Sequence, residues 1–145
     1  MKNIRTLLVG VLILAGSTGY AFLRGAAGTD MTTAAEKFVQ SLSEAQRAQA
    51  VLAYDAPART DWHYIPKPNR KGLQVKEMTE PQRLAAFDLL HSALSEAGYG
   101  KARKIMSLES VLRELEKSRT GAPLRDPERY YFTLFGQPSA TGRWG

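Results

Sequence analysis

The segment Arg129-Tyr-Tyr-Phe-Thr-Leu-Phe135 is the only convincing β-strand in this sequence, and just ten residues follow it. Its aromatic and β-branched residues favour an extended backbone. A strand carries a row of N–H and C=O groups that need a partner, and even a two-stranded hairpin is only marginally stable in water. The strand therefore either closes a mainly helical domain or belongs to a domain whose remainder is absent. The second interpretation is favoured, so we expect the strand to lack partners in this chain.

Composition limits the chain to one domain and excludes several classes of protein. The 145 residues are 43% hydrophobic, which is enough for a single core. The absence of cysteine excludes a disulfide scaffold, a thiol nucleophile and a cysteine-ligated zinc or iron–sulfur site. The formal net charge is +6, but the basic residues are spread along the chain and form no recognisable nucleic-acid-binding module. We therefore predict no nucleic-acid partner.

Residues 1–21 have the pattern of a secretory signal peptide. Two basic residues precede the apolar run 7–14, and the small residues of 16–21 suit a cleavage site. The alternative is an uncleaved anchor formed by residues 6–23, because the apolar stretch resumes after the glycines. Either way, we predict an exported protein in the periplasm or outside the cell, which contacts the membrane only if the leader is retained.

The remaining chain predicts an α+β, mainly α fold, which is the N-terminal part of one incomplete domain over residues 31–145. The expected elements are a flexible linker (22–30), a first helix (31–54), a long ordered loop (55–78), a second helix from Thr79 to Gly98 or Gly100, a third helix (101–118) and the C-terminal strand lacking its partners. Thr79 and Gln82 form a capping box at the start of the second helix. A similar pattern, Ser43 with Gln46, would break the first helix if Ser43 were a cap, but we consider this coincidental.

Helical periodicity predicts which face of each helix is buried. Apolar residues recur at intervals of three and four in all three predicted helices. The expected buried positions are Phe38, Leu42, Ala45 and Leu52 in the first helix, Leu84, Phe87, Leu90 and Leu94 in the second, and Ile105, Leu108, Leu112 and Leu115 in the third.

A series of short motifs in residues 62–145 is similar to the N-terminal part of a bacterial family of domains of unknown function, DUF3500. The motifs are Trp62-His-Tyr-Ile-Pro66, Arg70-Lys-Gly-Leu73, Met78-Thr79, Gln82-Arg83, Leu94-Ser95, Gly98-Tyr99, Ile105-Met106, Arg125-Asp-Pro-Glu-Arg-Tyr-Tyr-Phe-Thr-Leu-Phe-Gly136 and Pro138-Ser139. The resemblance implies a truncated domain that continues into an Arg- and His-rich segment. It brings no established activity, although that histidine-rich segment suggests metal-dependent chemistry in the full-length protein.

His63 and Asp126 are weak candidates for catalytic residues. His63 lies between two aromatic residues in the long loop, where an aromatic cluster anchoring the loop is the simpler interpretation. Asp126 precedes a proline, which suits a turn in which Arg125 pairs with it, and a carboxylate pair with Glu128 is the alternative. One histidine cannot form a metal site by itself, so we predict no metal site within this chain.

The long loop also predicts a ligand pocket that combines aromatic and cationic side chains. Its expected members are Trp62, Tyr64, Arg70, Lys71 and, from the later turn, Arg125. Arginine suits bidentate contacts with carboxylates, whereas the simpler interpretation is a solvated basic surface. The expected partner is a small-molecule or peptide ligand. Two functions stay open: an exported metal-dependent enzyme whose site is completed outside this chain, and a non-catalytic binding or structural module of the cell envelope.

Overall fold

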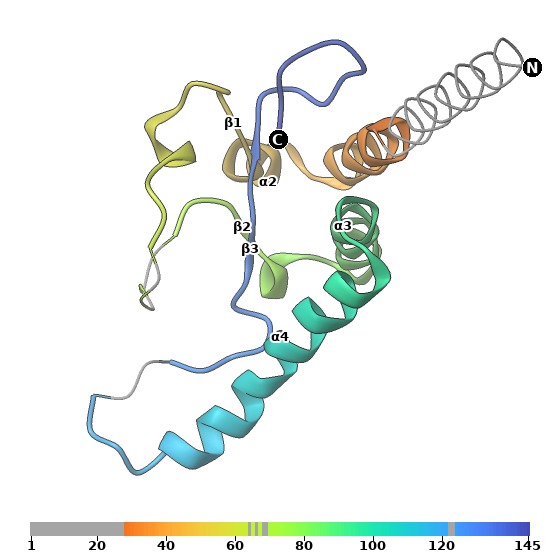
Figure 1. Cartoon of the computed structure of the whole chain (residues 1–145). Coiled ribbons are helices and arrows are strands. Elements are labelled where there is room, and N and C mark those ends of the chain that lie inside the picture. Colours follow the sequence, from red (N-terminus) through yellow and green to blue (C-terminus); the bar gives the residue numbers. More distant parts are fainter. Residues whose placement is uncertain (1–27, 64, 66, 68–69, 122–123) are drawn as a thin grey trace, which may run out of the picture.

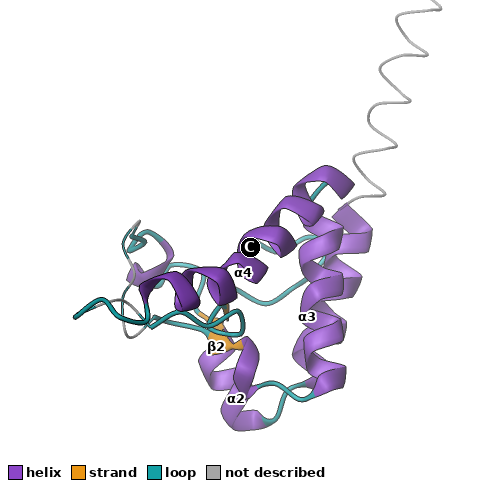
Figure 2. Cartoon of the chain, turned by 90° about the horizontal axis from the view of Figure 1, so that it is seen from below, coloured by secondary structure: helices purple, strands orange, loops and turns teal. Residues whose placement is uncertain are grey.

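The computed structural model describes residues 28–63, 65, 67, 70–121 and 124–145. These residues form four α-helices and four two-residue strands, so the predicted α+β, mainly α class is confirmed (Figures 1 and 2). In chain order the elements are a helix over residues 28–41, α2 (Glu44–Ala50), β1 (Val51–Leu52), the 3-10 turn Pro57–Arg59, β2 (Leu73–Gln74), the 3-10 turn Val75–Glu77, α3 (Glu80–Ala93), α4 (Glu96–Glu116), β3 (Tyr131–Phe132) and β4 (Leu134–Phe135).

The predicted leader, residues 1–21, lies outside the described residues. So does the uncleaved anchor predicted for residues 6–23, together with most of the predicted linker. Residues 28–30, which we assigned to that linker, are helical. Among the described helices, none has the length and apolar sequence required to span a membrane.

The predicted helix over 31–54 is in fact two helices that are interrupted at Ser43. The Ser43 hydroxyl accepts a hydrogen bond from the backbone N–H of Gln46 (3.3 Å), and the Ser43 N–H donates to the Gln46 side-chain oxygen (3.1 Å). This capping box begins α2, and after Ala50 the backbone is extended in β1. The sequence similarity between the two capping patterns, which we considered coincidental, therefore marks two real helix starts.

The two capping boxes are joined through their glutamines. The Gln46 amide nitrogen donates to the Gln82 side-chain oxygen (3.1 Å) and to the Glu77 carbonyl (3.0 Å). The Gln82 amide nitrogen donates to the Gln46 side-chain oxygen (2.8 Å) and to the Ser41 carbonyl (2.8 Å). Each glutamine also accepts from the N–H of its own cap residue, Ser43 or Thr79. The starts of α2 and α3 are therefore held together by one nearly symmetric polar junction.

The predicted start of α3 at Thr79 is confirmed, but the predicted glycine terminus is wrong. α3 ends at Ala93, and Ser95 caps α4 by accepting a hydrogen bond from the backbone N–H of Gly98 (3.2 Å). Gly98 and Gly100 consequently lie in the first turns of α4 instead of ending α3. A serine cap satisfies N–H groups that would otherwise lack partners, and here it outweighs the low helix propensity of glycine.

The C-terminal strand has partners on both sides of Thr133, so the expectation that it lacks them is wrong. β3 pairs antiparallel with β2, with Leu73 opposite Phe132. β4 pairs in parallel with β1, with Val51 opposite Leu134. One extended segment thus takes its first partner from the end of the long loop and its second from the residues just before that loop (Figure 1). The hydrogen-bonding groups of the strand are satisfied by segments far away in the sequence.

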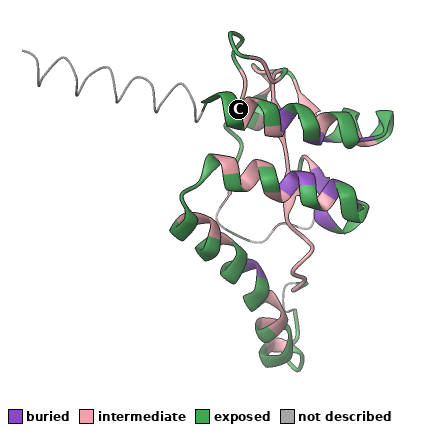
Figure 3. Cartoon of the chain, turned by 90° about the vertical axis from the view of Figure 1, so that its right-hand side faces the viewer, coloured by how far each residue is buried: buried purple, intermediate pink, exposed green. Residues whose placement is uncertain are grey.

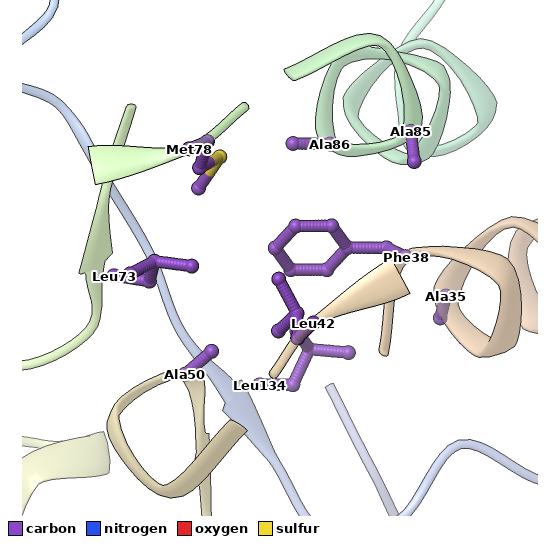
Figure 4. Packing of buried hydrophobic residues seen from close by; sticks show 9 residues of the cluster. All are labelled: Ala35, Phe38, Leu42, Ala50, Leu73, Met78, Ala85, Ala86 and Leu134. Carbon is purple, nitrogen blue, oxygen red and sulfur yellow. The ribbon is translucent and has the colours of Figure 1, made fainter. Parts of the chain in front are cut away.

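The core lies between the helix over 28–41, α3 and these strands. Phe38 and Leu73 are its largest fully buried side chains. The Phe132 ring packs against Phe38 (centroids 5.8 Å apart) and edge-on against Phe87 (5.9 Å). Figure 4 shows nine members of this cluster, Ala35, Phe38, Leu42, Ala50, Leu73, Met78, Ala85, Ala86 and Leu134. Of the positions predicted to be buried in the first helix, Phe38 and Leu42 are buried, Leu52 is partly buried and Ala45 is exposed.

The predicted apolar face of α4 is wrong as a core face. Ile105, Leu108 and Leu115 are exposed, Leu115 by 73%, and Met106 is the buried residue of this helix. In α3, Leu84 is likewise exposed, whereas Ala85 and Ala86 are buried. Figure 3 shows the long helix α4 mainly in the colours of exposed and intermediate residues. Periodicity identified the apolar stripe correctly, but within the described residues three of its four members are exposed and only Leu112 is partly buried.

Candidate functional site

The long loop between β1 and β2 is held in shape by Arg70. Its Nη2 atom donates to the carbonyls of His63 (3.3 Å) and Ile65 (2.8 Å). His63 Nε2 lies 3.0 Å from Asp61 Oδ1 and also contacts the Lys67 ammonium. Because backbone carbonyls in a loop have no regular secondary-structure partner, a guanidinium with five donors is suited to gather two of them.

Four of the predicted site residues line one cavity of about 410 Å³, which we call the loop cavity. Its lining consists of Ala58, Arg59, Asp61, Trp62, His63, Lys67, Arg70 and Lys71 from the loop and of Tyr131, Thr133 and Phe135 from the strand segment. Trp62 is 65% exposed, which is unusual for so large an aromatic residue. Tyr64, the remaining loop residue of the predicted pocket, lies outside the described residues.

Sequence reasoning missed the strand residues of this cavity, although a signal for them was present. Side chains alternate between the two faces of a strand. Phe132 and Leu134 belong to the core, whereas Tyr131, Thr133 and Phe135 line the loop cavity. The period-two pattern of this segment would have placed these three residues on one face, opposite the core.

Two further hollows meet the loop cavity at Arg70 and Tyr131. The helix-side hollow, of about 490 Å³, is lined by Lys67, Arg70, Glu109, Arg125, Asp126 and Tyr131, among others. The strand-side hollow, of about 660 Å³, includes Arg70, Lys71, Gln74, Lys76, Glu77 and Tyr131. The Tyr131 hydroxyl accepts a hydrogen bond from the side chain of buried Gln74, which fixes the ring at this meeting point.

Arg125 is bound to α4 and does not pair with Asp126. Its Nε donates to Glu116 Oε2 (2.9 Å), and its Nη1 lies 3.6 Å from Glu109 Oε2. The hydrogen bond from Arg125 lowers the pKa of the Glu116 carboxyl, while the same bond raises the pKa of the guanidinium. Glu109 also accepts a hydrogen bond from the hydroxyl of Tyr130 (3.4 Å). These contacts fasten the segment before β3 onto the last half of α4.

Asp126 and Glu128 each have a local structural partner. Asp126 Oδ1 accepts from the backbone N–H of Glu128 (2.9 Å), and the Asp126 carbonyl accepts from the N–H of Arg129 (3.0 Å). The Glu128 carboxylate accepts hydrogen bonds from both terminal nitrogens of Arg83, and the bond from Nη2 is 3.2 Å long. An Asx turn and a bidentate ion pair account for both carboxylates. Sequence reasoning missed the contact with Arg83 because the two residues are far apart in the chain.

Tyr130, which also lines the helix-side hollow, has a hydroxyl whose pKa is raised above its ordinary value. Burial is the largest cause and raises the pKa of its hydroxyl, and the negative charge of Glu109 raises it further. In the described part of the chain, no group of three or more His, Cys, Asp or Glu side chains is placed to hold a metal ion. The arrangement is therefore a set of adjacent, mainly cationic hollows with aromatic walls.

Comparison with known proteins gives a family but no characterised relative. No curated protein and no solved structure matches the chain. A family profile matches residues 24–145, a longer range than the motifs over 62–145 that first indicated the resemblance. That match covers most of the sequence and confirms the predicted family. The chain belongs to the family described as Protein of unknown function (DUF3500).

Proposed function

We propose that this is an exported binding protein whose loop cavity holds a small ligand bearing a carboxylate and a flat apolar face. The observation that carries this proposal is the cavity lining, which places Lys67, Arg70 and Lys71 beside the exposed Trp62. Export is proposed from the leader pattern, with the periplasm or the cell exterior as the expected location.

Arg70 is the proposed anchor for the carboxylate. Both of its bonds to loop carbonyls use Nη2, and no described residue accepts a hydrogen bond from its Nε or Nη1. Within the described ranges, neither Arg70 nor Lys71 forms an ion pair with an acidic side chain. A guanidinium with donors to spare suits a carboxylate, and a hydrogen bond between charged groups contributes roughly 1.5–3 kcal/mol.

The test compares benzoate with benzamide, which has the same shape but no charge, by NMR-detected titration of the full chain. We expect benzoate alone to shift resonances of loop-cavity residues. Arg70→Lys should weaken benzoate binding about tenfold, because the ammonium keeps the charge but loses the fork geometry. Lys101→Ala, which removes an exposed charge on α4 outside all three hollows, is the matched control. Equal binding of benzoate and benzamide, or equal effects of the two substitutions, would contradict the proposal.

The second candidate is the metal-dependent enzyme, which is favoured by one contact, the pairing of His63 with Asp61. Both Asp61 and Lys67 contact Nε2, and no described residue is hydrogen-bonded to Nδ1, the ring nitrogen that a metal would use. A catalytic metal site needs about three protein ligands, and the described residues supply at most two here. Equilibrium dialysis of the full chain with Zn²⁺ tests this candidate: stoichiometric binding that is lost in His63→Ala would support it, and absence of binding would reject it.

A further inference from the structure

We infer that the ligand is a linear acidic saccharide built from uronate units, which occupies the loop cavity and continues past Arg70 into the neighbouring hollows. This inference rests on the proposed function, because it extends the same anion site at Arg70. It adds the chemical class of the ligand and the requirement for more than one unit.

The first argument is that the three hollows adjoin one another. The loop cavity, the helix-side hollow and the strand-side hollow all include Arg70 and Tyr131 in their walls. Their volumes, about 410, 490 and 660 Å³, each fall in the range of a complete small-molecule site. A single small acid fills one of them and leaves the others to solvent. An extended ligand with repeating units contacts all three through the shared residues.

The second argument is the mixture of charges. Each hollow combines cations with at least one carboxylate: Asp61 in the loop cavity, Glu109 and Asp126 in the helix-side hollow, and Glu77 in the strand-side hollow. A phosphate polymer carries closely spaced negative charges and no hydroxyl donors, so these carboxylates would repel it. A uronate chain carries one carboxylate per ring together with several hydroxyls. Its carboxylates suit the cations. Its hydroxyls suit the carboxylates of the three hollows, because an ionised carboxylate can accept further hydrogen bonds beside those of its structural partners.

The third argument is Trp62, which contributes a flat apolar surface to the lining of the loop cavity. Its side chain is 65% exposed although it lies among charged residues. Aromatic rings make large contacts at little cost in conformational entropy, and a sugar ring presents an apolar C–H face that can pack on them. Trp62 is therefore assigned to ring stacking and Arg70 to the carboxylate.

The experiment titrates the full chain with galacturonate monomer, trimer and hexamer by isothermal titration calorimetry. Fully methyl-esterified oligomers are the uncharged control, and polyphosphate is the competing polyanion. We expect the trimer and hexamer to bind at least tenfold more tightly than the monomer, as linked contacts do. The esterified oligomers should not bind, and polyphosphate should bind more weakly than the hexamer.

One substitution separates this inference from the proposed function. Lys76 is exposed and lines the strand-side hollow but not the loop cavity. Lys76→Ala should weaken hexamer binding several-fold and leave monomer and benzoate binding unchanged, whereas Lys101→Ala should change neither. Equal affinity for monomer and hexamer, or tighter binding of polyphosphate, would overturn the saccharide inference and leave the anion site at Arg70 standing. If the chain binds neither benzoate nor any of the galacturonate ligands, both the saccharide inference and the proposed anion site at Arg70 are overturned.

Discussion

Replacing Gln82 by alanine should destabilise the fold more than any other glutamine-to-alanine change in the described residues. Gln82 is 7% exposed, and its side chain takes part in four hydrogen bonds, with the Thr79 N–H, the Ser41 carbonyl and both ends of the Gln46 amide. Each such bond contributes roughly 0.5–1.5 kcal/mol net. Water can reach part of the junction after truncation, so we expect a loss of about 2–4 kcal/mol in the free energy of unfolding.

Gln82→Glu tests the contribution of the two hydrogen bonds that the Gln82 amide nitrogen donates. It keeps the size of the side chain and the acceptor for the Thr79 N–H. It replaces the donating nitrogen with an oxygen that faces the Ser41 carbonyl and the Gln46 oxygen, two acceptors. Because unpaired polar groups at a buried site are costly, this variant should also lower the free energy of unfolding by about 1–3 kcal/mol.

Urea unfolding followed by circular dichroism measures these changes. Gln40→Ala, on the exposed face of the helix over 28–41, is the matched control and should change stability by less than about 0.5 kcal/mol. A double-mutant cycle of Gln46→Ala and Gln82→Ala should give a coupling energy of about 1 kcal/mol or more. If Gln82→Ala and Gln40→Ala have the same effect, or if the cycle is additive, the junction does not stabilise the fold as argued.

Two further predictions concern the strand segment and its approach to α4. Gly72→Ala should lower the free energy of unfolding in urea by about 2 kcal/mol or more. Gly72 has φ +111°, and an added Cβ would collide with Thr133 Oγ1 and lie 2.7 Å from the Phe132 carbonyl oxygen. Gly100→Ala is the control, because open space surrounds Gly100, and it should stabilise α4 by about 0.5–1 kcal/mol. Because burial raises the pKa of the Tyr130 hydroxyl above its ordinary value of 10.0, the folded state holds this proton more tightly than the unfolded state, and the resulting stability is lost as the pH rises above that value. Tyr130→Phe should show a smaller loss between about pH 9 and pH 11, and an unchanged loss would contradict this assignment.

The sequence predicted one helix start correctly, that of α3, and placed the starts of the helix over 28–41 and of α4 at residues 31 and 101. Thr79 with Gln82 gave the start of α3 because a capping box depends only on residues within one turn. Ser43 with Gln46 carried the same signal, but the apolar periodicity that continued to Leu52 favoured an unbroken helix. The structure adds a contact between the two glutamines, which are 36 positions apart in the sequence, so neither local pattern could predict it.

Non-local partners limited the remaining predictions. The extended backbone of residues 131–135 was evident from the sequence. Its division at Thr133 was not, because the partners, β1 and β2, are strands of only two residues each. The apolar stripe through Leu108 was likewise recognised, but periodicity does not show what covers a face. The sequence correctly grouped the loop residues of the site. The contribution of Tyr131 could not be predicted, because it depends on how the strand lies against the loop.

The segment around Thr133 also has a consequence for the order in which this protein folds. The loop that carries Trp62 and Arg70 is flanked by β1 and β2, and both strands are completed only by residues near 131–135. These pairings join positions distant in sequence, and such contacts form slowly because loop closure comes first. During synthesis the loop is made long before its two strand partners. The loop cavity, which residues 131–135 help to line, can therefore assemble only after these residues have emerged, long after the loop itself has been made.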